Sequence, residues 1–445
     1  MLLENIDISP SLDLPETGEL LIKLGKSYMY KILEVTIDGF WSEFKVHGTF
    51  KDDVNIVIGK NGSGKTTFMN ILHAVLAVDI DALYENDFQV VTIKLHNGKN
   101  IRTVKAVKGE YAEAPFPRVE YQISTKKYNL PIISNDDRSF SPSLRRRAFE
   151  ESRQVRAELN RLVSLASLSV YRIGVDSDPD ARERPSKRII SPVDMRLSSL
   201  LQLLTHYQLD LSNQARAVST TLQRDVLISL LYESEILQNS FEDLDFDENV
   251  ERKNLISAYK QLGVSGSDVS KKISDHTSAI SKTINSLKSY KGDDELNFEL
   301  APLEARKRTR RVIEMSLLAE KKTTEIFSQI TDFLATIKDF IPEKKFEFVV
   351  GELQINGDDI PVERLSSGEK QLLILFVESL LQKHKPFVFL ADEPELSLHI
   401  SWQRKIISAI RKLNPRAQII VATHSPEIAG KFSDRIMDME DMLHV

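Results

Sequence analysis

The chain alternates between two kinds of hydrophobic pattern. Continuous apolar runs at Val54–Ile58, Pro386–Leu390 and Gln418–Ala422 predict strands that are buried on both faces. In Thr66–Ala77 the apolar residues recur with helical spacing, which predicts an amphipathic helix soon after the first of these strands. From Asp194 to about Ile341 the helical pattern dominates and β-branched runs are few. These patterns predict an α/β protein with a helical segment inserted between its two halves.

Weaker patterns add strands to both halves. Asn97-Gly98 stands between two alternating runs, which is the signal of a β-hairpin. The alternating run Arg118–Ile123 adds a strand to this hairpin, so we expect a small antiparallel sheet beside the buried strands. A strongly charged helix is expected over Ser143–Leu162. The other strands are expected over Tyr28–Ile37, Phe44–Phe50, Leu165–Ile173 and Phe346–Leu353.

The inserted segment is predicted to be helical, and glycines and a charged turn mark the breaks between its helices. No strict heptad persists over three or four repeats, so a compact arm is expected rather than a long coiled coil. Its helices are expected over Leu197–Leu211, Ala215–Asn239, Asn249–Gln261, Ser267–Ser289 and Ala305–Phe340. The expected domains are an N-terminal extension over 1–28, a first lobe over 29–193, the insertion over 194–341 and a second lobe over 342–445.

Composition narrows the class of protein. With 445 residues, 41% apolar and 28% charged, the chain has the make-up of an ordinary soluble globular protein. It contains no Cys, which excludes disulfides, Cys–Zn sites and thiol catalysis. The acidic N-terminal stretch does not resemble a signal peptide and there is no run of ~18 apolar residues, so a cytoplasmic location is expected. A net charge of −6 does not suggest wholesale coating of nucleic acid, so DNA or an acidic, DNA-like protein would bind only at local basic patches.

A glycine-rich stretch after the first buried strand fits the phosphate-loop pattern, with Gly59 followed after four residues by Gly64-Lys65-Thr66. Glycines let the backbone turn tightly, so that several N–H groups point at phosphate oxygens. Lys65 places a positive charge on the β and γ oxygens, and the Thr66 hydroxyl is a candidate ligand of Mg²⁺. The helix that follows adds its positive N-terminal dipole. The expected nucleotide-binding residues are Gly59, Lys60, Asn61, Gly62, Ser63, Gly64, Lys65, Thr66 and Thr67.

Two acidic residues and a histidine follow the other two buried strands. Pro386–Leu390 leads into Asp392-Glu393, so a parallel strand would deliver two carboxylates at its carboxyl end, where α/β sites lie. Asp392 would hold Mg²⁺, and Glu393 would act as general base on the attacking water. An acidic turn that closes an ordinary core strand is the weaker interpretation, because a phosphate loop stands upstream. Gln418–Ala422 leads into His424, which a strand end would place beside the carboxylates and within reach of the γ-phosphate.

The segment Ser366-Ser367-Gly368-Glu369 stands just before an apolar helix, Leu372–Leu381. Hydroxyls, a glycine without a side chain and a helix N-terminus together form an anion site. Taken alone, the segment is better interpreted as a helix cap with a Glu in the first turn. Its position shortly before the carboxylate pair favours the anion site.

Along the chain the four motifs are the phosphate loop, the signature segment at 366–369, the carboxylate pair and the histidine, with a large insertion after the first. In this order they resemble those of ABC-type ATPases of the SMC/RecF/OLD group over residues 28–175 and 345–436. The resemblance implies an α/β fold, namely an ABC-type P-loop ATPase head with a mixed or parallel core sheet, a small antiparallel sheet and an inserted helical subdomain. It implies ATP and Mg²⁺ as cofactors. The implied catalytic residues are Lys65, Glu393 and His424, and the implied metal ligands are Thr66 and Asp392.

In this family the signature segment, here Ser366, Ser367, Gly368 and Glu369, serves the γ-phosphate held by the other protomer. One chain with one set of motifs would therefore supply half of each composite site, which implies a homodimer or a larger ring. The family also has a Q-loop glutamine, for which Gln89, Gln122 or the region Ser169–Arg172 are the candidates. The basic runs at Arg145–Arg147, Arg182–Arg188 and Arg306–Arg311 are more often solvated helix faces than ligand sites.

A stand-alone ATPase with a short helical insertion is most similar to ATPase subunits of prokaryotic anti-phage systems, the PARIS ATPase first and the Septu and retron-associated ATPases second. The sequence stops at Val445, shortly after the switch histidine, so no Toprim nuclease domain is expected in this chain. The resemblance implies a sensor or scaffold that controls a separate effector, a Toprim or HNH nuclease, in response to a viral protein. The alternative is a RecF-like or SMC-like ATPase of DNA repair or chromosome maintenance. A purely structural nucleotide-binding module ranks last, because Lys65, Asp392 and Glu393 are all present.

Overall fold

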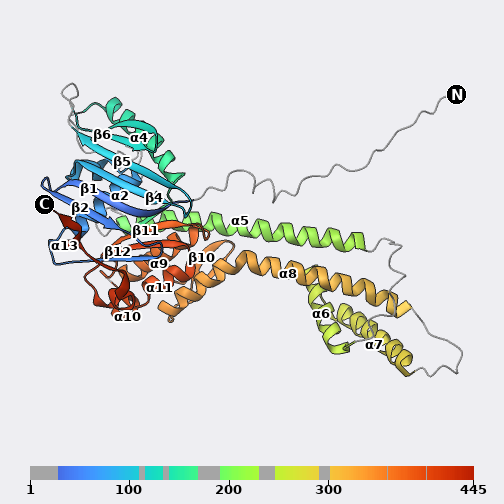
Figure 1. The fold of residues 1–445 in the computed structure, drawn as a ribbon. Helices are drawn as coiled ribbons and strands as arrows, with labels where there is room; N and C mark the ends of the chain where they lie inside the picture. Colours follow the sequence, from blue (N-terminus) through green and yellow to red (C-terminus); the bar gives the residue numbers. More distant parts are fainter. Residues whose placement is uncertain are drawn as a thin grey trace, which may run out of the picture. The chain divides into compact units, whose positions relative to one another are not determined.

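The computed structural model describes residues 29–109, 116–133, 140–168, 191–229, 246–289, 301–357, 359–396 and 398–444. The chain forms two units, of which unit 1 contains Met1–Ser198 and Glu363–Val445, and unit 2 contains Ser199–Val362 (Figure 1). These boundaries differ from the expected insertion of 194–341, because helix α5 (Pro192–Ser229) begins in unit 1 and the hairpin after helix α8 (Ala301–Phe340) belongs to unit 2. The extension expected over 1–28 lies outside the described residues.

Unit 1 contains a parallel and an antiparallel sheet, which confirms the expected fold class. The five-stranded parallel sheet has the order β13-β3-β12-β11-β8, and the seven-stranded antiparallel sheet has the order β14-β2-β1-β4-β5-β6-β7. The parallel strands are Val54–Ile58 (β3), Leu165–Leu168 (β8), Phe387–Asp392 (β11), Ala417–Ala422 (β12) and Ile436–Asp438 (β13). The antiparallel strands are Lys31–Phe40 (β1), Phe44–Thr49 (β2), Val90–His96 (β4), Ile101–Gly109 (β5), Arg118–Ile123 (β6), Lys126–Pro131 (β7) and Leu443–His444 (β14).

Helix α2 belongs to an apolar core that both sheets share. Phe68 and Leu72 of α2 lie in one buried cluster with Ile37 of β1, Leu390 of β11 and Ile420 of β12. The N-terminal end of α2 is thereby held against the parallel strands. The α-helices of unit 1 besides α5 are Lys65–Ala77 (α2), Ile80–Glu85 (α3), Pro142–Asn160 (α4), Ser367–Leu381 (α9), Ile400–Gln403 (α10), Ile406–Leu413 (α11), Pro426–Ala429 (α12) and Met439–Met442 (α13).

The antiparallel sheet is larger than the small sheet that the sequence indicated. Strands β1 and β2 join it rather than leading into the parallel sheet, and β14 extends it from the other end of the chain. Strand β7 was not predicted from the sequence. It pairs with β6 through a tight turn at Ser124, whose φ of 56° lies in the left-handed region. Serine seldom adopts this conformation, so its presence did not predict a turn here. Of the strand expected over Leu165–Ile173, the part after Leu168 lies outside the described residues.

A buried glutamine joins the two sheets. The side chain of Gln418, at the start of β12, accepts a hydrogen bond from the backbone N–H of Ile32 at 2.7 Å and donates to the carbonyl oxygens of Ile32 at 2.7 Å and Lys51 at 2.9 Å. It is fully buried. Its amide group pairs with a backbone N–H and two carbonyl groups, as a backbone peptide group does in a β-sheet. It thereby links β12 to Ile32, which lies 386 positions earlier in the sequence.

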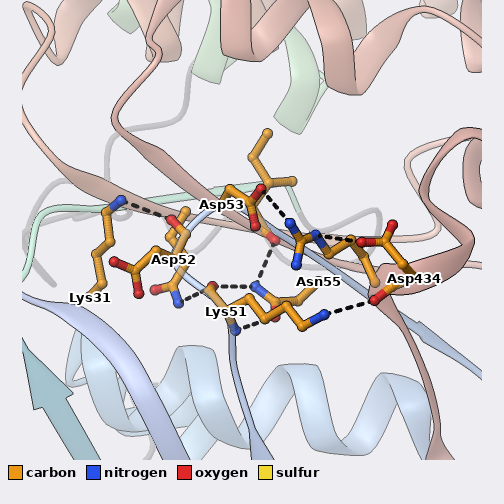
Figure 2. A network of polar contacts seen from close by, with 9 residues as sticks. Lys31, Lys51, Asp52, Asp53, Asn55 and Asp434 are labelled. Atoms are coloured by element: carbon orange, nitrogen blue, oxygen red, sulfur yellow. Dashed lines mark hydrogen bonds and ion pairs between the residues drawn. The ribbon is translucent and has the colours of Figure 1, made fainter.

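Figure 2 shows the polar network around the turn that enters β3. Asn55 donates to the carbonyl oxygen of Lys51 at 2.8 Å and accepts from its N–H at 2.7 Å. The ammonium of Lys51 donates to the carbonyl oxygen of Asp434 at 2.8 Å, and that of Lys31 donates to the backbone carbonyl oxygen of Asp52 at 2.8 Å. These bonds satisfy the backbone of the turn and hold the start of β3 in place, so the phosphate loop at the other end of this strand has a rigid support.

Unit 2 contains most of α5, the helices α6 to α8 and a hairpin. Its elements are α5 (Pro192–Ser229), α6 (Glu248–Gln261), α7 (Ser267–Ser289), α8 (Ala301–Phe340), β9 (Phe346–Val349) and β10 (Glu352–Ile355). Leu255, Ile273 and Ile313 form a small apolar core among α6, α7 and α8. The hydroxyl of Tyr207 on α5 donates to Gln329 on α8 at 2.8 Å, which links the two long helices. At about 1.5 Å per residue, the 40 residues of α8 span about 60 Å.

Helix α8 has a partial heptad spacing. Its buried positions Ser316, Ile330 and Ile337 are spaced by multiples of seven, and so are Ala319, Phe333 and Phe340. The heptad positions between them, Thr323 and Ile326, are only partly buried. The buried series is therefore interrupted, which is consistent with the expectation that no strict heptad persists.

Two expectations from the sequence were wrong in unit 2. The helices expected on either side of Ser212 form a single helix over the described residues, because its hydroxyl turns back to the carbonyl oxygen of Gln208 at 2.9 Å and leaves the backbone helical. The strand expected over Phe346–Leu353 is a hairpin. Val350 and Gly351 both have positive φ, as a two-residue hairpin turn requires.

We predict that Gln418→Ala destabilises unit 1 by about 3 kcal/mol, because it leaves the backbone groups of Ile32 buried without partners. Urea denaturation followed by tryptophan fluorescence measures this unit, since Trp41 and Trp402 both lie in it. The matched control is Gln122→Ala, which removes one bond to the carbonyl oxygen of Ser124 at a partly exposed position. Equal losses of stability in the two variants would contradict the prediction.

Candidate functional site

The site is formed where three neighbouring parallel strands end. In register, Val57 of β3 pairs with Ala422 of β12, and Ala422 pairs with Asp392 of β11. The phosphate loop follows β3, the histidine loop follows β12 and the carboxylate pair ends β11, so all three lie at the same edge of the sheet. This is the edge at which the sequence predicted them.

The phosphate loop has the backbone that its glycines permit. Gly59, Gly62 and Gly64 have φ values of 150°, 82° and 96°, in the region that side chains disfavour. Gly64 also needs its lack of a side chain for space, because a Cβ there would lie 2.9 Å from two ring carbons of Phe40 and 3.0 Å from Trp41. Gly64 caps α2 without a side-chain bond and no acidic residue stands in the first turn, so the N-terminus keeps its attraction for an anion.

Lys65 is buried and folds back over the loop that contains it. Its ammonium donates to the carbonyl oxygens of Gly59 at 2.9 Å and Lys60 at 3.0 Å. Burial lowers the pKa of Lys65, and the nearby carboxylates, first Glu393 and then Asp392, act in the opposite direction. Two other residues of the loop, Lys60 and Asn61, are exposed. The hydroxyl of Ser63 is buried and has no hydrogen-bond partner among the described residues.

Asp392 and Thr66 lie close together, which fits a shared metal ion. The Oδ1 atom of Asp392 is buried with no partner among the described residues. Burial raises the pKa of Asp392, while the nearby Thr66 side chain and Lys65 oppose the shift. A buried carboxylate oxygen without a partner, beside a hydroxyl, is the donor set that Mg²⁺ takes at phosphate sites.

Glu393 and His424 face each other across β11 and β12. The Nε2 atom of His424 lies 3.6 Å from Oε1 of Glu393, and both side chains are partly exposed. The backbone N–H of Glu393 donates to the carbonyl oxygen of Ala422 at 2.8 Å, which extends the ladder of the two strands by one residue. Glu393 has a φ of 48°, an unfavourable value for a residue with a side chain, and such strained positions are common at functional sites.

Glu395 also belongs to the site, although the sequence gave it no role. Its Oε1 atom accepts hydrogen bonds from the Thr423 hydroxyl at 2.6 Å and from the backbone N–H groups of His424 at 2.9 Å and Ser425 at 3.1 Å. Two of the three partners are backbone N–H groups, which lie 29 and 30 positions after Glu395 in the sequence. Because nearly every residue has such a group, a sequence pattern cannot predict these bonds. The acidic run that contains Glu395 was the only available signal.

The signature segment forms the N-terminus of α9. Ser366 caps the helix and exchanges hydrogen bonds with Glu369 in a capping box, so the helix-cap interpretation is correct as local structure. Ser366 and Ser367 are exposed and Gly368 is buried. A cap and an anion site are compatible here, because the exposed hydroxyl of Ser367 takes no part in the capping box. The binding role of the segment stays a prediction.

Two ion pairs join α9 to the first turns of α5 within unit 1. Lys370 lies 2.7 Å from Asp194, and the guanidinium of Arg196 donates from Nε to Glu378 at 3.0 Å. Glu378 is buried, and burial raises its pKa while Arg196 opposes the shift. A buried carboxylate needs such a partner, so the pair holds the first turn of α5 against α9.

The remaining candidates either make contacts within their own strands and helices or lie outside the described residues. Gln122 is a strand residue whose side chain bonds to the backbone of Ser124, and Gln89 precedes β4 and bonds through its backbone to both neighbouring strands. On α4, Arg146 and Arg147 pair with glutamates four residues on, as on a solvated helix face. On α8, Arg310 does the same with Glu314. Ser169–Arg172 and Arg182–Arg188 lie outside the described residues.

Comparison with known proteins gives one family match and several relatives. The model of the family described as AAA ATPase domain matches residues 30–429. A retron Vc95 probable ATPase of Vibrio cholerae serotype O1 biovar El Tor is 23% identical over 84% of this chain and 66% of its own length. A putative ABC transporter ATP-binding protein of Caldanaerobacter subterraneus subsp. tengcongensis is 32% identical over 26% of this chain and 49% of its length. A retron Ec83 probable ATPase of Escherichia coli is 37% identical over 16% of each chain. The chain thus spans 66% or less of the length of these relatives.

Solved structures of Smc head domains are also similar. The Smc head domain of Pyrococcus furiosus, solved with an extended coiled coil and the C-terminal domain of ScpA, aligns with a TM-score of 0.41 and 14% identity over 90% of this chain and 92% of that one. The SMC head domain of Thermotoga maritima aligns with a TM-score of 0.36 and 11% identity over 90% of this chain and 91% of that one. Within the described part of the chain, no helix has both the length and the apolar character that crossing a membrane requires.

We predict that Lys65→Ala abolishes ATP binding or weakens it severely, because its ammonium lies against the phosphate loop, where the β and γ oxygens would bind. Isothermal titration calorimetry measures the affinity. Lys126→Ala, which removes an exposed ammonium paired with Glu158, is the control and should bind like the unchanged protein. An unchanged affinity of Lys65→Ala would show that the loop does not hold the phosphates.

Proposed function

The chain belongs to the family of AAA ATPase domains and hydrolyses ATP, and we propose that it does so as the sensor or scaffold subunit of an anti-phage defence system. In this proposal the ATPase controls a separate effector, a Toprim or HNH nuclease or another toxin, and a viral protein is the trigger. Similarity to two retron ATPases supports a defence role. The likeness to the PARIS ATPase has no such support and stays a prediction.

The geometry of the site supports the chemistry proposed for it. The backbone amides of the phosphate loop and Lys65 bind the phosphates, and Glu393 accepts a proton from the attacking water. His424 lies beside Glu393 and donates to the γ-phosphate. Thr66 and Asp392 would hold Mg²⁺, which neutralises the charge that develops on the phosphate oxygens.

We further propose that two copies close around ATP. The exposed hydroxyl of Ser367 at the N-terminus of α9 suits an anion presented from outside the chain, namely the γ-phosphate bound to a second copy. One chain carries one phosphate loop and one signature segment, so a homodimer would contain two composite sites.

The observation that carries the control role is the attachment of α5 to the signature helix. Lys370 and Glu378 of α9 pair with Asp194 and Arg196 at the start of α5, and α5 continues without a break to Ser229 in unit 2. When ATP draws the N-terminus of α9 toward a second copy, the start of α5 is pulled with it. A continuous helix transmits that movement along its length, so unit 2 can report the nucleotide state to an effector.

We predict that the composite site can be rebuilt from two defective copies. Lys65→Ala removes the phosphate-loop charge and Ser367→Arg blocks the signature segment, so each variant alone should hydrolyse little ATP. A mixed dimer would keep one intact composite site, and its ATPase rate should recover toward half of that of the unchanged dimer. Ser143→Arg, at an exposed serine of α4, is the control for the added arginine and should keep full activity. Mixed dimers that form and stay inactive would exclude a site shared between copies.

We predict that defence requires hydrolysis. The ATPase is co-expressed with the product of the adjacent gene and the cells are challenged with phage. The unchanged pair should protect, whereas Lys65→Ala and Glu393→Gln should not, since loss of a general base costs ~10²–10⁴ in rate. Glu150→Gln, at an exposed residue of α4, is the matched control and should protect.

The defence role fails if the unchanged pair gives no protection and the two variants behave in the same way. The alternative, a RecF-like or SMC-like ATPase acting on DNA, then takes its place. ATP-stimulated binding to bare duplex DNA that weakens steeply with salt would support that alternative.

A further inference from the structure

We propose that Glu395 is a positioning residue for ATP hydrolysis, which holds the loop Thr423–Ser425 so that the imidazole of His424 faces Glu393. This inference rests on the role proposed above for His424. Glu395 would touch neither ATP nor the attacking water. It would act through the histidine.

The bonds made by Glu395 are concentrated on the histidine loop. A single carboxylate oxygen accepts from three consecutive residues, the Thr423 hydroxyl at 2.6 Å and the N–H groups of His424 at 2.9 Å and Ser425 at 3.1 Å. Thr423 is almost fully buried, and its hydroxyl oxygen also accepts from the N–H of Ser425 at 2.9 Å. Bonds to a charged acceptor are about twice as strong as neutral ones, so this anchor specifies the backbone on both sides of the histidine.

The same anchor connects the histidine to the general base. Glu393 and Glu395 belong to one short turn after β11, and Glu393 is joined to β12 by its own N–H bond to Ala422 at 2.8 Å. Two hydrogen bonds therefore hold Glu393 and His424 at 3.6 Å from each other. One joins Glu393 to Ala422, the last residue of β12, and the other joins Glu395 to the backbone of His424 in the loop that follows. Without Glu395, the backbone of His424 would lose the link that follows the strand.

The charge on Glu395 is not explained by stability alone. Its second oxygen, Oε2, is buried and has no partner among the described residues. A buried carboxylate oxygen without a hydrogen bond is costly. A glutamine could still accept hydrogen bonds from the loop through its amide oxygen without burying a charge. The strongest gain from a full negative charge is the short bond to Thr423 and the rigid loop that results.

Other contacts brace Ser425 but not His424. Gln403 accepts from the Ser425 hydroxyl at 2.8 Å, and the N–H of Glu427 donates to the same hydroxyl at 3.2 Å. The carboxylate of Glu427 pairs with Arg404 on the surface. Glu427 is therefore a matched control: it is a glutamate next to the same loop, with an ion pair of its own and no bond to the histidine.

The test is a double-mutant cycle on the ATPase rate, using Glu395→Ala, His424→Ala and the double variant in the full chain. We expect each single variant to lower kcat by about 10²-fold, the effect of losing one positioned donor, and the double variant to be no slower than His424→Ala. ATP affinity should change little in Glu395→Ala, since no bond to the phosphate loop is removed. Glu395→Gln keeps an acceptor oxygen and should retain an intermediate kcat. Glu427→Gln should keep the rate of the unchanged protein.

Several outcomes would overturn the inference. A kcat of Glu395→Ala close to that of the unchanged protein means that the anchor does not affect hydrolysis. Multiplied effects in the double variant mean that Glu395 acts independently of His424. If His424→Ala hydrolyses ATP normally, the role proposed for His424 fails together with the inference. If His424→Ala is slow and Glu395→Ala is not, the inference alone fails. If Glu395→Ala does not fold, Glu395→Gln carries the test, and a kcat equal to that of the unchanged protein counts against the anchor.

Discussion

The site depends on the parallel register of β3, β12 and β11. Gly59 follows the first of these strands and Asp392 ends the third, so two ends of a long sequence meet only because β12 lies between them. Gln418 fixes this middle strand to the antiparallel sheet through the backbone of Ile32 and Lys51. A slip of one residue in any of these pairings would turn every side chain to the opposite face and separate the carboxylates from the phosphate loop.

The charges of the site are arranged for a ligand that carries both signs. Lys65 is buried and its pKa is lowered, while Asp392 is partly buried and its pKa is raised. Each charged form is therefore less favourable than in water, and each would be stabilised by an opposite charge close by. A phosphate chain with a bound cation would bring an anion to Lys65 and a cation to Asp392 at once. Binding of the proposed metal–nucleotide complex would thus relieve the cost of burial on both sides.

Carboxylate groups in unit 1 join segments that are far apart in sequence. The turn after β11 contains Glu393, the proposed general base, and Glu395, whose carboxylate accepts hydrogen bonds from a hydroxyl and backbone N–H groups of the histidine loop. Helix α9 is joined to the start of α5 by the ion pairs of Lys370 with Asp194 and of Glu378 with Arg196, and α5 continues into unit 2. Carboxylates therefore serve both the proposed chemistry in unit 1 and the proposed signal to unit 2.

The sequence alone determined the elements whose signals are local. The glycines of the phosphate loop, the buried strands before Asp392 and His424, and the serine cap of α9 all follow from short-range backbone chemistry, and the structure places each where the pattern predicted. Only the tertiary structure decided the rest. Ser316 and Ala319 of α8 are buried because of their neighbours rather than because of their own hydrophobicity. The role of Glu395 rests on backbone N–H groups, which every residue except proline has and no sequence pattern reveals.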